Sequence, residues 1–137
     1  MMLSRGIRNN NPGNIRKSLS QFQGEITPST DPAFKQFKSV DWGYRAMFLI
    51  IHNYDQLYGI NTLGKIISRW APAVENDTNI YIKTVAKRLG ISSSGYIDSL
   101  NKEVMVTMVG AMSRIENGVA PIEADIELGW ELFIAGR

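Results

Sequence analysis

The chain has few side chains suited to catalysis, and carboxylates dominate them. Asp and Glu number 13, against one histidine, His52, and no cysteine. The lack of cysteine excludes Cys-based zinc sites, and one histidine leaves little material for a metal cluster or a Ser-His-Asp triad. The chemistry that remains open is proton transfer by Asp or Glu, and we expect neither a metal nor a cofactor.

Two carboxylates lie in a polar N-terminal region, where Glu25 is the first acidic residue and Asp31 the second. Alternation in "FQGEI" predicts a short strand with Phe22 and Ile26 on one side and Glu25 on the other. "AFKQF" predicts a second short strand or turn, and "TPSTDP" between them is typical of a loop. We therefore expect a small β-hairpin.

The stretch "RNNNPGNIRKS" precedes this hairpin. Asparagine competes with its own backbone for hydrogen bonds, and Pro-Gly favours a turn, so neither a helix nor a buried strand is expected. Two interpretations stand side by side. The loop caps the hairpin, or it forms a rigid wall of a binding cleft, where amides donate to and accept from sugar hydroxyl and N-acetyl groups.

The rest of the chain shows helical periodicity, with about five helices between turn and capping signals. The first helix runs from Asp41 to a stop at Gly59. The second, "LGKIISRW", is capped by Thr62 and ended by Pro72, and the third, "NIYIKTVAKRL", is capped by Asp77 or Thr78 and closed by Gly90. The fourth, "LNKEVMVTMVGAMSRIE", is capped by Ser99 and stops at Asn117-Gly118, and the last begins at Pro121 and ends at Gly136. The sequence predicts one domain over 1–137, with a polar loop and β-region at 1–40 and helices at 41–137. Its class is mainly α, or α+β by a strict count.

Several residues that invite a functional interpretation are better explained by structure. His52 lies on a mainly apolar helix and is expected to be structural. The methionines at helical spacing (Met105, Met108 and Met112) predict core packing, and the acidic stripe (Glu123, Glu127 and Glu131) predicts a solvated face.

The stretch "TVAKRLGISSSGYIDSL" resembles a helix-turn-helix. Its second helix would offer hydroxyls but no Arg, Lys or Gln in its first turns to reach base edges. The net charge of +2 also gives little support for a phosphate-binding stripe. A nucleic-acid module is therefore the weakest of the alternatives.

Two other stretches resemble the lysozyme-like superfamily of muramidases and lytic transglycosylases. "NPGNIRKS" resembles the NPxAxS element that follows the catalytic Glu in such folds. "DTNIYIKTV" resembles the E-T-R-x-Y-V segment that carries the cleft tyrosine, although Asn79 replaces its arginine. With "RNNNPGNIR" and further matches in order, roughly residues 5 to 90 resemble a lysozyme-like family frequent in bacteriophages and prophages.

The resemblance implies a lysozyme-like fold and a peptidoglycan glycan strand as the ligand. The residues that it places at the substrate are Asn11, Asn14, Arg16, Asn76, Thr78 and Tyr81. The chain departs from the family at the acid, because the family's Glu lies four residues before the Asn, and that position here is Ile7. We therefore predict that Glu25 is the catalytic acid.

The resemblance implies cleavage between MurNAc and GlcNAc units by a glycosidase. A hydrolase would need a second carboxylate, for which Asp31 is the nearest candidate, whereas a lytic transglycosylase uses one acid and the sugar's own 6-hydroxyl. Since the usual Glu is missing, a catalytically silent phage or prophage protein, structural or glycan-binding, stays an alternative.

The expected cellular location follows from two features that the sequence lacks, a membrane-spanning stretch and a signal peptide. The longest apolar run, Ala46–Ile51, is too short to span a membrane, and "MMLSRG" does not resemble a signal peptide. We expect synthesis in the cytoplasm and action on the cell wall through lysis or a phage particle. The expected partners are the glycan strand and phage particle components, with no membrane span.

Overall fold

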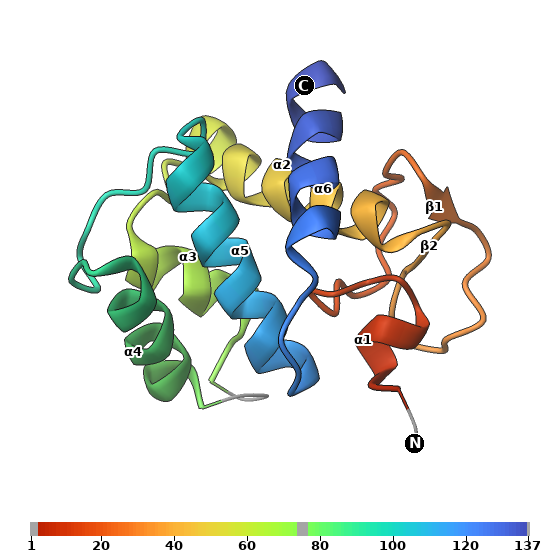
Figure 1. The fold of residues 1–137 in the computed structure, drawn as a ribbon, viewed down its shortest axis with the longest axis horizontal. Helices are drawn as coiled ribbons and strands as arrows, with labels where there is room; N and C mark the ends of the chain where they lie inside the picture. Colours follow the sequence, from red (N-terminus) through yellow and green to blue (C-terminus); the bar gives the residue numbers. More distant parts are fainter. Residues whose placement is uncertain (1–2, 74–76, 137) are drawn as a thin grey trace.

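The computed structural model describes residues 3–73 and 77–136. In this part of the chain a small two-stranded hairpin lies at one side of six helices (Figure 1). The elements are α1 (Arg5–Arg8), β1 (Glu25–Ile26), β2 (Gln36–Phe37), α2 (Val40–Tyr58), α3 (Leu63–Trp70), α4 (Thr78–Leu89), α5 (Lys102–Asn117) and α6 (Glu123–Gly136). The strands are antiparallel, with Glu25 opposite Phe37. The predicted mainly α class with an N-terminal hairpin is confirmed. None of the described helices is long and apolar enough to cross a membrane.

Local signals set most helix boundaries. Gly59, Gly90 and Gly118 follow α2, α4 and α5 in the left-handed conformation, which suits a residue without a side chain. The Asp77 side chain accepts from the Ile80 amide at the start of α4, as a helix cap does. Thr62 precedes α3 as predicted, although its side chain makes no capping bond.

Three helix starts differ from the prediction. An added turn, α1, forms because the Ser4 hydroxyl accepts from the Ile7 amide. The cap of α5 is Asn101, whereas Ser99 is buried and hydrogen-bonds to His52 Nδ1 at 2.8 Å. Helix α6 begins at Glu123, two residues after Pro121.

The apolar core lies between α2 and the helices around it. Phe48 of α2 packs edge-on to Trp130 of α6 at 5.1 Å between ring centroids, and Phe133 lies beside both rings. Helices α2 and α6 approach closely at Gly129, where a Cβ atom would lie 2.5 Å from Tyr44 Cβ. The predicted core methionines are buried in the same cluster.

The first strand of the hairpin buries Glu25 and exposes Ile26. Ile26 is 39% exposed, whereas the Glu25 side chain is only 5% exposed. The reason lies across the hairpin, where the fully buried Lys35 ammonium requires a carboxylate partner.

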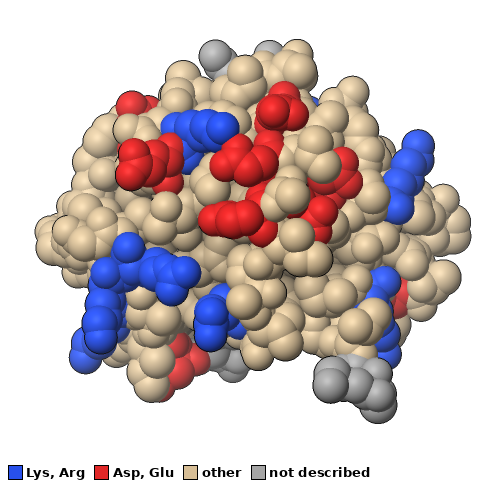
Figure 2. All heavy atoms as spheres, in the orientation of Figure 1, with Lys and Arg blue, Asp and Glu red and all other residues tan. Residues whose placement is uncertain are grey.

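The helix-turn-helix interpretation lacks its second helix. After α4 the chain forms no helix until Lys102, and Tyr96 instead makes an isolated bridge with Thr62. Figure 2 shows acidic side chains gathered over the face where α5 and α6 lie. Basic side chains gather in the same view at the lower left, near α4, and the acidic group separates them from the basic side chains at the right. Among the described residues no continuous basic stripe, which phosphates would require, crosses this face.

Candidate functional site

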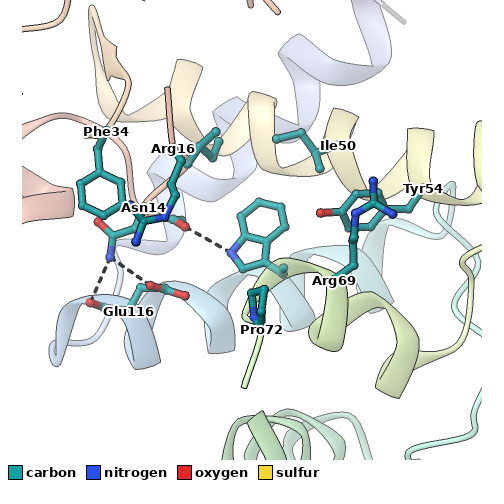
Figure 3. Close-up of a pocket in the computed structure, with 11 residues that line it drawn as sticks. Asn14, Arg16, Phe34, Ile50, Tyr54, Arg69, Pro72 and Glu116 are labelled. Carbon is teal, nitrogen blue, oxygen red and sulfur yellow. Dashed lines mark hydrogen bonds between the residues drawn. The ribbon is translucent and has the colours of Figure 1, made fainter. Parts of the chain in front are cut away.

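A pocket of about 430 Å³ opens where the N-terminal loop meets α2, α3 and the end of α5. It is lined by Gly13, Asn14, Ile15, Arg16, Phe34, Ile50, Tyr54, Arg69, Trp70, Pro72 and Glu116. Figure 3 shows Asn14, Phe34 and Glu116 at one end of this pocket and Tyr54 and Arg69 at the other. Its volume lies in the roughly 300–1,000 Å³ range of small-molecule sites.

Glu116, in the last turn of α5, is the carboxylate of this pocket. One carboxylate oxygen accepts from Asn14 Nδ2 at 2.9 Å and the other from the Tyr81 hydroxyl at 3.0 Å. Burial raises the pKa of Glu116, and these two hydrogen bonds oppose part of that rise. A carboxyl group that has a raised pKa and faces a pocket is suited to general acid catalysis.

Tyr81 supports Glu116 from α4. The tyrosine is buried, and burial together with the neighbouring Glu116 carboxylate raises the pKa of its hydroxyl far above the ordinary value. The phenol therefore stays protonated and remains a hydrogen-bond donor. Tyr81 therefore contacts the carboxyl group of the pocket, although its own side chain does not line the pocket.

The polar loop holds Asn14 in place through unusual backbone geometry. Asn10 and Asn14 have φ angles of 52° and 50°, the left-handed region that asparagine tolerates better than most other residues. The Asn10 amide donates to the Phe37 carbonyl at 3.1 Å, which ties the loop to β2. The loop therefore braces the hairpin through Asn10 and lines the pocket through Asn14.

Asn11 belongs to the bracing part. It is fully buried, and its amide nitrogen donates to the carbonyls of Ile15 and Lys35, both at 2.9 Å. Its oxygen accepts from the Ile15 amide at 2.9 Å. With these partners, Asn11 shapes the loop from within and does not reach the pocket.

The same loop clasps the end of α5. Asn117 donates to the Pro12 carbonyl at 2.9 Å and accepts from the Ser4 hydroxyl at 2.8 Å. Glu116 and Asn14 are therefore brought together by contacts between segments 102 residues apart in the chain.

Trp70, the last residue of α3, also lines the pocket. Its indole nitrogen donates to the Gly13 carbonyl at 3.2 Å. A Cβ atom at Gly13 would lie 2.6 Å from the indole ring, so the loop can approach this closely only with glycine at that position.

Two arginines stack on aromatic rings at the two ends of the pocket. The Arg16 guanidinium lies 4.9 Å from the centroid of Phe34. Arg69 lies over both Tyr54 and Tyr58, at 5.7 and 5.4 Å from their centroids. Stacking of this kind restrains a guanidinium while it stays charged.

Glu25, the sequence-predicted acid, does not line this pocket. Its oxygens accept from Lys35 Nζ at 3.0 and 3.1 Å, and one also accepts from the Phe22 amide. The Lys35 side chain is 1% exposed, so the pair is enclosed by the hairpin. This geometry describes a buried ion pair that holds the hairpin together.

Asp31, the predicted second carboxylate, is also engaged in the loop region. Arg5 binds both of its oxygens, at 2.6 and 2.8 Å, and Asn9 donates to one of them. The Arg5 guanidinium, helped by the amides of Ala33 and Phe34, holds the pKa of Asp31 far below its usual range. Asp31 is not among the residues that line the pocket.

Two predicted residues remain. The Thr78 hydroxyl donates to the Ala71 carbonyl at 2.6 Å and secures the start of α4, outside the pocket. Asn76 lies outside the described residues. Of the six residues that the resemblance placed at the substrate, Asn14 and Arg16 line the pocket and Tyr81 reaches it through Glu116.

Sequence reasoning missed Glu116, Arg69 and Trp70. Glu116 did leave a signal, because it continues the buried stripe of α5 four residues after Met112. A carboxylate on the apolar face of a helix is costly unless hydrogen-bonded, and it can therefore indicate a site.

Comparison with known proteins adds a relationship to a phage. No protein-family model matches the chain. The chain is 40% identical to Protein P5 of Pseudoalteromonas phage PM2 over 132 residues, which span 93% of this chain and 81% of that protein. Identity at this level over most of both lengths means that the chain belongs to the same family as this bacteriophage protein.

Proposed function

We propose that the protein binds a glycan strand of peptidoglycan in the pocket and cleaves it, with Glu116 as the general acid. The observation that supports this most directly is a carboxyl group with a raised pKa that faces a pocket large enough for a sugar ligand. Glu116 replaces Glu25 in this role, because Glu25 is occupied by Lys35 and lies outside the pocket.

The surroundings of Glu116 suit a carbohydrate. Phe34, Trp70 and Tyr54 contribute apolar ring surface, and Asn14 and Arg16 contribute polar groups beside the carboxyl group. The lining thus combines apolar ring surface with polar groups that can bind sugar hydroxyls.

The position of Glu116 also explains the departure from the lysozyme-like pattern. That pattern has its acid shortly before the Asn-Pro element, where this chain has Ile7. Here the carboxyl group beside the loop comes from α5, and Asn117 next to it binds the Pro12 carbonyl. We infer that the acid is supplied from a distant part of the chain to a similar polar loop.

The described lining of the pocket holds one carboxylate, Glu116. One acid/base suits the transglycosylase scheme that the resemblance implies. Glu116 would give its proton to the oxygen of the breaking glycosidic bond, and the resulting carboxylate would take the proton of the sugar's 6-hydroxyl as that oxygen attacks the anomeric carbon. The proton balance closes without water as a reactant.

The phage relationship gives this activity a setting. We infer that the protein acts on the cell wall of a host during lysis or as a part of a phage particle, with particle components as further partners. In this setting peptidoglycan is the barrier that such an activity would open.

A glycan-binding protein without catalytic activity is the second candidate. The observation in its favour is that both oxygens of Glu116 already accept hydrogen bonds, one from Asn14 and one from Tyr81. A proton on Glu116 would require one of these donors to turn away or its hydrogen bond to weaken.

The substitution Glu116→Gln separates the two candidates. It keeps the shape and removes the titratable proton, so we expect clearing of purified peptidoglycan to fall by roughly 10²–10⁴-fold. Glu103→Gln, on the exposed first turn of the same helix, is the matched control and should clear at the wild-type rate.

The outcomes are distinct. Wild-type clearing by a folded Glu116→Gln protein would show that Glu116 is not the acid. Binding of insoluble peptidoglycan by a wild-type protein that does not clear it would favour the second candidate. A wild-type protein that neither clears nor binds peptidoglycan would contradict the proposed function as a whole.

A further inference from the structure

The end of the pocket away from Glu116 carries a cation held by two aromatic rings. Tyr54 and Tyr58 are four residues apart on α2 and therefore share one face of the helix. Arg69, near the end of α3, lies over both rings. We call these three residues the arginine clamp.

Arg69 carries a charge that no ion pair balances among the described residues. Its side chain is exposed, and it forms no ion pair with any residue in the described part of the chain. Tyr58, 62% exposed, is also open to solvent beside it. A positioned guanidinium without a carboxylate partner is free to bind one from a ligand.

The Arg69 guanidinium carbon lies 5.7 Å from the ring centroid of Tyr54 and 5.4 Å from that of Tyr58. A guanidinium held over aromatic rings can still donate hydrogen bonds through its N–H groups. These donors match the two oxygens of a carboxylate, which can accept two parallel hydrogen bonds.

The charge of the whole pocket supports the same ligand chemistry. Arg16 and Arg69 both line it, and Glu116 is its one described carboxyl group, with a pKa raised by burial. Arginine side chains therefore outnumber carboxyl groups among the described lining residues, which favours an anionic ligand over a neutral one.

We propose that the arginine clamp is a subsite for a carboxylate carried by a sugar, and that it makes the pocket selective for acidic glycan strands over neutral ones. This proposal rests on the proposed glycan-binding function and adds to it a position and a substrate class. The sugar with the carboxylate would lie toward α2 and α3, while the bond to be broken lies toward Glu116, at the opposite end of the pocket (Figure 3).

The test compares two ligands of nearly the same shape. One is a tetrasaccharide of alternating N-acetylglucosamine and N-acetylmuramic acid, and the other is the same tetrasaccharide with its lactyl carboxylates converted to amides. Binding is followed by NMR titration into Glu116→Gln protein, so that no ligand is consumed. We expect the acidic ligand to bind roughly three- to tenfold more tightly, since the clamp is partly open to solvent.

Variants then assign that preference to a residue. Arg69→Gln should erase the preference and leave the affinity for the amide ligand almost unchanged, whereas Arg69→Lys should keep part of it. Lys65→Gln is the matched control, because Lys65 lies one turn earlier on α3, is exposed and does not line this pocket. Circular dichroism and thermal unfolding of each variant show that it is folded.

Each outcome has one meaning. Equal binding of both ligands would overturn the subsite and leave the glycan-binding function standing. A preference that persists in Arg69→Gln would also overturn the assignment, since another cation would then be responsible. Failure of both ligands to bind up to millimolar concentration would contradict the subsite and the proposed function together.

Discussion

Residues 40–136 and residues 4–37 bury their side chains against different kinds of partner. In the helical part, Phe48, Trp130 and Phe133 meet ring against ring within an apolar cluster. In the N-terminal part, the buried side chains include Lys35 and Asp31, each with an oppositely charged partner.

The difference matters because the two kinds of contact respond differently to change. Apolar burial is non-directional and does not depend on pH, whereas a buried ion pair depends on geometry and on both charges. The pocket lies where the two regions meet, with Asn14 and Arg16 from the polar region and Arg69, Trp70 and Glu116 from the helical one. The polar contacts of the N-terminal region therefore position Asn14 and Arg16, which apolar packing alone would not do.

The largest effect is expected when the buried Lys35–Glu25 pair is broken. Lys35→Met leaves the Glu25 carboxylate buried without its cation, which typically costs about 3–5 kcal/mol of unfolding free energy. Glu25→Gln alone should also destabilise the protein, because the Lys35 charge then lacks its partner. In the double variant Glu25→Gln/Lys35→Met most of the stability should return, as urea unfolding can measure.

The same variants decide between Glu25 and Glu116 as the acid. A loss of clearing in Glu25→Gln alone would be ambiguous, because it combines lost stability with lost proton transfer. The double variant removes this ambiguity, and we expect it to clear peptidoglycan like the wild type. A stable double variant without activity would restore Glu25 as the acid and contradict the assignment to Glu116.

This comparison also shows what the sequence could predict. Helices α2 to α5 are bounded by signals that act within a few residues, such as the Asp77 cap and the left-handed Gly59 and Gly90. Ser99 misled the prediction, because its hydroxyl bonds His52, a residue 47 positions away, in place of capping α5. The residues next to Ser99 in the sequence do not indicate that its hydroxyl bonds a distant histidine.

The site was less predictable than the fold for the same reason. Asn14 and Arg16 were identified through a family resemblance, but the carboxyl group that they flank lies 102 residues beyond Asn14. Alternation placed Glu25 on the side of its strand away from Phe22 and Ile26, but it could not show that Glu25 pairs with a buried lysine across the hairpin. Pairings between distant polar residues leave little periodicity in a sequence.

A second test of the comparison uses acid. The folded-state pKa of Asp31 is lowered by Arg5, so its stabilising contribution is present above its ordinary value of about 3.9 and is lost as the pH falls below it. The amides of Ala33 and Phe34, which donate to Asp31, should therefore lose protection from hydrogen exchange between about pH 4 and pH 2 while amides of α2 stay protected.

Asp31→Asn provides the control for this acid effect. The amide cannot pair with Arg5 as a carboxylate does, so the variant should be less stable at pH 7, and its deficit relative to the wild type should shrink in acid. A deficit that stays constant from pH 7 to pH 2 would mean that the ionised form of Asp31 does not stabilise the hairpin.

The smallest predicted effect concerns the boundary between the regions, at the hydrogen bond from Tyr81 to Glu116. This bond favours the charged form of Glu116 and lowers its pKa, against the rise that burial causes. Tyr81→Phe removes the donor, so the pKa of Glu116 should rise further. If the protonated acid is the active form, clearing is lost as the pH rises through this pKa, and the alkaline limb of the pH profile should move to higher pH in the variant.

Tyr44→Phe is the matched control, because it also removes a buried hydroxyl that bonds a residue of α5, in this case Ser113 at 2.8 Å. Its pH profile should coincide with that of the wild type even if its stability falls. A limb that stays in place in Tyr81→Phe would mean that Glu116 does not set the pH dependence, and a limb that moves to lower pH would mean that the hydroxyl favours the protonated form. A shift to higher pH in Tyr81→Phe alone would tie the activity to one carboxyl group, since the Tyr81 hydroxyl donates to no other described carboxylate.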